Sequence, residues 1–160
     1  MALLEINGVN LWVEEEGSGP AMVFVHEFGG DHRVWREQIN HFRDRYRCVA
    51  FNARGYPPSD VPDEAEAYGQ DIAIADMLGV LDALNIDKAH LLGLSMGAYN
   101  VLRFALDHPD RVLSLTATHI LENKPRGEHS LPLSIQVACG QNSQFFRRIV
   151  LRWWSMSRCE

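Results

Sequence analysis

Hydrophobic and polar residues alternate along this chain in a pattern that predicts strands and helices in turn. Short apolar runs, too short for buried helices, are typical of strands covered on both faces. Strands are expected at residues 3–6, 11–15, 21–25, from Cys48 onward, 89–94 and 112–118. Apolar residues at helical spacing predict helices over 35–42, 71–84 and 96–106.

Two local features add detail to this pattern. Asn7-Gly8 separates the first two predicted strands and favours a tight hairpin turn. Within 71–84 the apolar residues share one side of the predicted helix, with Asp76 and Asp82 on the other. Asp76 is therefore expected to be a solvent-exposed acid.

The order of these elements indicates the fold class. A strand, a helix and a second strand form the unit that builds parallel sheets, because the crossover helix covers one face. We therefore predict an α/β fold with a mostly parallel sheet covered by helices on both faces. No later strand is recognisable, so the sheet is expected to end after 112–118. Ligands of such sheets bind beyond the carboxyl ends of the strands.

A serine lies at that edge in a specific context. Gly93, Ser95 and Gly97 form a Gly-x-Ser-x-Gly sequence between a predicted strand and a predicted helix. This is the arrangement of a nucleophile elbow, in which a strained turn holds the serine Oγ clear of the backbone. Glycines are needed two residues before and after the serine because the turn leaves no room for side chains there. Ser95 is therefore the candidate nucleophile.

The loop after the strand over 21–25 complements this serine. It reads His26-Glu27-Phe28-Gly29-Gly30 and can present a free backbone N–H. A serine esterase needs two such donors for the oxyanion, one from this loop and one from the residue after the nucleophile. These donors correspond to the N–H groups of Phe28 and Met96. A histidine at the end of a buried strand is more often packed and hydrogen-bonded than catalytic, so His26 is interpreted as structural.

Three motifs in the same order resemble those of the α/β-hydrolase superfamily, in its serine-nucleophile branch. Residues 93–97 match the nucleophile motif, and 26–30 resemble His-Gly-x-x-Gly with Glu27 in place of glycine. Residues 52–59 are similar to Asp-x-Arg-Gly-x-Gly-x-Ser, with Asn52 in place of the acid and prolines in place of the second glycine. The resemblance implies hydrolysis of an ester, lactone or related acyl bond through an acyl-enzyme at Ser95. A serine weighs against the dehalogenase and epoxide-hydrolase branches, which use aspartate there.

The rest of the triad is the open question. The resemblance implies an acid and then a histidine after the serine, and Glu122, at the carboxyl end of the last predicted strand, is the candidate acid. His108 lies at the far end of the helix that follows the serine, about 20 Å away at 1.5 Å per residue. His119 adjoins the candidate acid and is poorly placed to bridge it to the nucleophile; His129 follows later in the chain. The alternative is a non-catalytic, truncated or frame-shifted hydrolase fragment that lacks the base.

Composition divides the chain into two expected parts. Residues 1–123 are acidic and are predicted to form the hydrolase core portion, whereas 124–160 are basic and contain two of the four tryptophans. The second part is expected to be a tail that is disordered or contains one amphipathic helix around 145–154, covering the core in preference to binding a membrane or nucleic acid. The edge left open at 112–118 could pair two chains into a homodimer.

The remaining composition excludes several function classes. The chain has a net charge of −6, which argues against a polyanionic partner, so no nucleic acid is expected. The partner that the resemblance implies is a small-molecule acyl substrate. It has no apolar stretch of signal or membrane-spanning length. Its three cysteines lack CxxC spacing, which favours a reducing cytoplasmic location. No motif predicts a metal site or a cofactor.

Overall fold

The computed structural model describes residues 1–120 and 133–138 of the 160-residue chain. Its strands are β1 (Ala2–Ile6), β2 (Val9–Glu16), β3 (Ala21–Val25), β4 (Arg47–Phe51), β5 (Ala89–Leu94), β6 (Val112–Ile120) and β7 (Leu133–Ala138). Its α-helices are α1 (Arg36–Phe42), α2 (Gln70–Ala83) and α3 (Met96–Asp107). Short 3-10 helices are η1 (His32–Trp35), η2 (Ala65–Ala67) and η3 (Pro109–Arg111).

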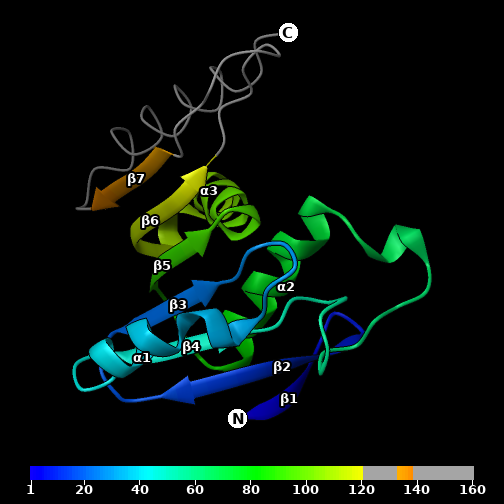
Figure 1. Cartoon of the computed structure of the whole chain (residues 1–160), viewed down its shortest axis with the longest axis horizontal. Coiled ribbons are helices and arrows are strands. Elements are labelled where there is room, and N and C mark those ends of the chain that lie inside the picture. Colours follow the sequence, from blue (N-terminus) through cyan, green and yellow to red (C-terminus); the bar gives the residue numbers. More distant parts are fainter. Residues whose placement is uncertain (121–132, 139–160) are drawn as a thin grey trace, which may run out of the picture.

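The strands form one sheet in the order β1-β2-β4-β3-β5-β6-β7 (Figure 1). The four central strands β4, β3, β5 and β6 run parallel, and β1, β2 and β7 are antiparallel to their neighbours. The first two strands form the hairpin expected at Asn7-Gly8, where both residues have positive φ. The predicted α/β class with a mostly parallel sheet is therefore confirmed.

Both faces of the central sheet are covered, as the continuous apolar runs require. In β3, Val23 and Val25 pack into the core beneath α2 and α3, whereas Met22 and Phe24 point to the opposite face. There they meet Trp35 and other side chains from η1 and α1. Helix α1 begins at Arg36, one residue later than predicted, because residues 32–35 form a 3-10 turn that is capped by the Asp31 side chain.

The prediction that the sheet ends at β6 is wrong. Strand β7 pairs antiparallel along β6, with Leu115 opposite Val137 and Ala117 opposite Ile135 (Figure 1). The edge of β6 that we expected to be open for a homodimer is therefore paired within the chain. Residues 133–138 alternate apolar and polar side chains, which is typical of a half-buried strand, so the sequence contained a signal that the prediction overlooked.

Apart from β7, the predicted tail lies outside the described residues. The helix expected at 145–154 also lies outside the described residues. So does the candidate acid Glu122, which belongs to the predicted core portion. Within the described part of the chain, no helix combines the length and the apolar character needed to cross a membrane.

Candidate active site

Ser95 occupies a sharp turn between β5 and α3. Its backbone has φ 49° and ψ −112°, a conformation that L-residues rarely adopt. Its N–H donates to the carbonyl of Thr118 on β6 at 2.9 Å, and its carbonyl accepts from Ala98 in the first turn of α3. The turn is therefore fixed on both sides, and the strained conformation expected from the Gly-x-Ser-x-Gly spacing is present.

The two glycines of the motif are required by close backbone contacts. A Cβ on Gly93 would lie 2.3 Å from the carbonyl oxygen of Gly97. A Cβ on Gly97 would lie 2.2 Å from the carbonyl oxygen of Val25, at the end of β3. Both distances are far below van der Waals contact and involve backbone atoms, which cannot rotate away. The turn therefore packs against the end of β3 only if both residues lack side chains.

The loop after β3 lies against the same cavity as Ser95. Phe28 is 80% exposed and lines that cavity together with Ser95 and Met96. Glu27 folds back over its own loop, so that its Oε1 lies 2.3 Å from where a Cβ on Gly30 would stand. The substitution of Glu27 for the usual glycine is therefore accommodated by Gly30. The structure brings together the three predicted residues Ser95, Phe28 and Met96, and the role of the two N–H groups stays a prediction.

His26 is buried and uses both ring nitrogens on the backbone. Its Nε2 accepts from the N–H of Ala53 at 3.1 Å, and its Nδ1 lies 2.8 Å from the carbonyl of Glu27, to which it donates in the neutral form. The ring also packs edge-on against Tyr56. These contacts agree with the structural interpretation of His26, since they join the loop after β3 to the loop after β4.

Acidification is expected to weaken the fold through His26. Burial holds the pKa of His26 below its ordinary value, so between that value and the lower folded pKa only the unfolded chain binds the proton. The contribution of His26 to the free energy of unfolding is therefore fully present above about pH 6.5. It decreases below that pH, by at most about 1.4 kcal/mol per pH unit for one proton. Urea unfolding at several pH values measures this slope.

The variant His26→Asn should have a smaller slope than the wild-type chain. Part of the slope should remain, because burial also lowers the pKa of His90. As a control, His41→Asn changes an exposed histidine of α1 and should keep the wild-type slope. An unchanged slope in His26→Asn would contradict the expectation.

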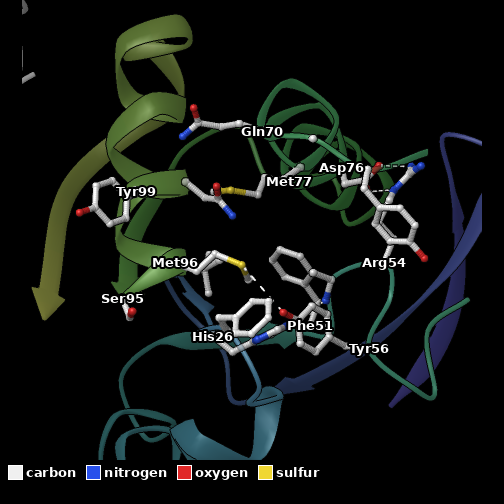
Figure 2. A pocket seen from close by; sticks show the side chains of 17 residues that line it. His26, Phe51, Arg54, Tyr56, Gln70, Asp76, Met77, Ser95, Met96 and Tyr99 are labelled. Atoms are coloured by element: carbon white, nitrogen blue, oxygen red, sulfur yellow. Dashed lines mark hydrogen bonds and ion pairs between the residues drawn. The ribbon is translucent and has the colours of Figure 1, made fainter. Parts of the chain in front are cut away.

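A cavity of about 620 Å³ extends from Ser95 between the sheet, α2 and α3. Its walls are mainly apolar, with Phe51 and Tyr56 on one side and Met77 on the other (Figure 2). Ser95 lies at the end of α3 that faces His26 (Figure 2). Mostly apolar cavities with a few polar groups are typical of small-molecule sites.

The far wall of the cavity contains a buried ion pair, which corrects the sequence interpretation of Asp76. Asp76 is only 2% exposed, and Arg54 donates to both of its carboxylate oxygens, at 2.7 and 2.8 Å. Asn7 donates to the same carboxylate, and Arg54 also donates to the carbonyl of Ala67. Helical periodicity could not reveal this pair because Arg54 lies on another element.

The loop after β4 explains one departure from the family motif. Asn52 is fully buried, and its Oδ1 accepts from the N–H of His32 at 2.9 Å. Its Nδ2 donates to the carbonyls of Tyr56 and Pro57. An aspartate could not donate these two bonds, so asparagine suits the path that this loop takes.

The histidines that follow Ser95 are not brought to its side chain within the described residues. His108 caps the far end of α3, as expected. His119 is exposed near the end of β6 with φ 56°, and no hydrogen bond joins it to Ser95 among the described residues. Glu122 and His129 lie outside the described residues, so their roles stay predictions. Among the residues that the structure describes, no three His, Cys, Asp or Glu side chains are grouped to hold a metal ion.

A sequence profile described as "alpha/beta hydrolase fold" matches residues 20–151. The chain belongs to the α/β-hydrolase family. The resemblance inferred from three motifs is therefore confirmed over most of the chain.

Relatives of this hydrolase chain include proteins named for two different reactions. It is 41% identical over 106 residues to an epoxide hydrolase of Caballeronia sordidicola, which covers 66% of the chain and 32% of that protein. It is 35% identical over 116 residues to 3-oxoadipate enol-lactonase 1 of Acinetobacter baylyi, covering 70% of the chain and 42% of that protein.

Solved structures of epoxide hydrolases have the same fold as this chain. The epoxide hydrolase of Bacillus megaterium in complex with an inhibitor superposes with a TM-score of 0.69 at 32% identity, covering 71% of this chain and 40% of that one. An epoxide hydrolase of Vigna radiata superposes with a TM-score of 0.70 at 28% identity, covering 71% and 36%. The chain thus spans well under half the length of these relatives.

Proposed function

We propose that this α/β-hydrolase chain hydrolyses an ester, lactone or related acyl bond through a covalent acyl-enzyme at Ser95. The observation that supports this proposal is the serine itself, at a strained turn on the edge of an apolar cavity. Two backbone N–H groups of the same cavity wall, those of Phe28 and Met96, would stabilise the oxyanion.

The choice between acyl and epoxide substrates follows from the chemistry of a serine nucleophile. Attack of a hydroxyl oxygen on an acyl carbon produces an ester, which water can hydrolyse to restore the serine. Attack on an epoxide carbon would produce an ether, which water does not cleave, so Ser95 would remain alkylated. Among the relatives reported above, the name enol-lactonase fits this chemistry better than the name epoxide hydrolase.

The proposed reaction has two steps. Ser95 Oγ adds to the carbonyl carbon while a base takes its proton, and the oxyanion accepts hydrogen bonds from Phe28 and Met96, each worth about 3 kcal/mol in the transition state. The intermediate expels an alcohol or enol, which receives the proton. Water then adds to the acyl-serine, releases a carboxylic acid and restores Ser95. Glu122 remains the predicted acid that would orient the base.

A second candidate function is acyl binding without turnover by this chain alone. It is favoured by one observation, the lack of a hydrogen bond between Ser95 and a histidine within the described residues. Without a base, the oxyanion donors and binding still accelerate acyl transfer by about 10³ to 10⁴-fold over water. Turnover of an activated aryl ester on the order of 10 s⁻¹, an ordinary enzymatic rate, would exclude this candidate.

The variant Ser95→Ala tests the proposal. A fluorophosphonate probe should label the wild-type chain at one site, and Ser95→Ala should remove both the label and aryl ester hydrolysis, because it removes the proposed nucleophilic hydroxyl. Intact-protein mass spectrometry measures the label. As a control, Ser18→Ala changes an exposed loop serine and should be labelled like the wild type. Labelling that persists in Ser95→Ala would remove this residue from the mechanism.

A further inference from the structure

Asn100 is a polar residue on the buried side of α3. It is 8% exposed, and its neighbours in the helix, Val101 and Leu102, are fully buried. It lies four residues after Met96, so the two side chains share one face of the helix. Both line the cavity that begins at Ser95.

The Asn100 side chain makes no hydrogen bond to another described residue, and its amide atoms are not sealed inside the protein, because they border the cavity. Asn52 provides the contrast, since its buried amide is bonded through both Oδ1 and Nδ2. An apolar molecule in the cavity would displace water from the Asn100 amide without replacing its hydrogen bonds, which costs binding free energy. Because Asn100 lines the cavity, its donor and its acceptor are available to a molecule bound there.

We propose that Asn100 selects the substrate by binding a neutral polar group, such as a ketone, hydroxyl or amide, carried on an otherwise apolar acyl chain. This inference rests on the proposed acyl hydrolysis at Ser95 and specifies its substrate class. Asn100 lies five positions after Ser95, which corresponds to about 7.5 Å along the helix axis. The polar group should therefore stand some six bonds from the scissile carbonyl.

The other walls of the cavity explain why this group is neutral. Arg54 and Asp76 satisfy one another, so the pair offers no unmatched charge to a carboxylate. Phe51 and Met77 supply apolar surface along the path (Figure 2). Among the described residues, the hydroxyl of Tyr56 donates to the weak acceptor Sδ of Met96, at 3.9 Å.

The test compares three aryl esters of equal chain length. One is the octanoate, the second carries a ketone beside the terminal methyl, and the third ends in a carboxylate. We expect the wild-type chain to prefer the keto ester to the octanoate by about tenfold in kcat/KM, because the octanoate leaves the Asn100 amide unpaired. The carboxylate ester should be the poorest of the three.

The isosteric variant Asn100→Leu should lose the preference for the keto ester and melt at a higher temperature than the wild type. As a matched control, Asn40→Leu makes the same change on the exposed side of α1 and should keep the wild-type preference. Ala73→Leu reduces the cavity from the α2 side and should slow both neutral long esters more than an aryl acetate. A keto preference that survives Asn100→Leu, or a wild-type preference for the octanoate, would overturn the inference.

Binding separates this inference from the proposed reaction. The Ser95→Ala variant should bind the keto ester about tenfold more tightly than the octanoate by calorimetry, and adding Asn100→Leu should remove the difference. If Ser95→Ala leaves hydrolysis intact but this binding difference is seen, the proposed mechanism fails and the substrate assignment stands. Equal binding of both esters to Ser95→Ala would reject the assignment even if Ser95 is the nucleophile.

Discussion

Replacement of Gly97 by alanine is expected to lower the reactivity of Ser95 more than a hundredfold and to destabilise the fold. The new Cβ would stand 2.2 Å from the carbonyl oxygen of Val25, so the start of α3 must move away from β3 by about an ångström. Displacement on that scale typically costs about 10²-fold in rate. Overpacking of this kind costs about 1 to 3 kcal/mol or more in stability. The fluorophosphonate labelling rate and urea unfolding measure the two effects.

Gly8 provides the control for this substitution. Unlike Gly97 it has a positive φ, 79°, but a Cβ there meets nothing within 4 Å. The variant Gly8→Ala should therefore lower the free energy of unfolding only by the backbone strain of about 1 to 2 kcal/mol. Its Ser95 should be labelled by the fluorophosphonate at the wild-type rate. If Gly97→Ala retained normal labelling, the close approach of the elbow to β3 would not be needed for reactivity.

The variant Asp76→Asn is expected to reduce the free energy of unfolding by about 3 to 5 kcal/mol. It would leave the guanidinium of Arg54, only 10% exposed, without its charged partner in a mainly apolar wall. The loss should extend to the segment around Ala67, because the same guanidinium donates to the carbonyl of that residue. Urea unfolding gives the stability, and hydrogen exchange locates the loosened segment.

The same helix contains the matched control. Asp71 pairs with Arg103 at 3.4 Å, but its side chain is 87% exposed. Solvent screens such pairs, so Asp71→Asn should change stability by no more than about 0.5 kcal/mol. Equal effects of the two substitutions would show that the Arg54–Asp76 pair is not buried in solution. Replacing both Arg54 and Asp76 with apolar residues should recover part of the lost stability.

The sequence was sufficient wherever local patterns determine structure. Continuous apolar runs predicted β3 and β5. Periodicity predicted both ends of α2 and the end of α3 to within one residue, and the start of α3 at Met96. Glycine spacing predicted the turn at Ser95. The contact that requires Gly93 lies within the strand–turn–helix unit, whereas the one that requires Gly97 is with Val25 of β3.

Prediction failed where the deciding partner is distant in the chain. Asp76 was expected on the exposed side of its helix, but it is buried beside the cavity, where the path of the loop after β4 brings Arg54 to it. Strand β7 pairs with β6 across an intervening segment, and the alternation of apolar and polar residues over 133–138 was the local signal that pointed to it. Asn100 was missed for a different reason. It stands among apolar residues on the buried side of α3, a signal that the sequence contains and that points to the cavity.

The hydrogen bond from the Ser95 N–H to the carbonyl of Thr118 restrains the motion of the turn at Ser95. Thr118 also donates through its hydroxyl to the carbonyl of Gly93, so one residue of β6 holds both the end of β5 and Ser95. Opening the turn would require these bonds and the adjoining β5–β6 ladder to separate together, as in a cooperative sub-global unfolding event. Fluctuations of the candidate nucleophile are thereby coupled to the end of β6, from which the chain continues directly toward Glu122.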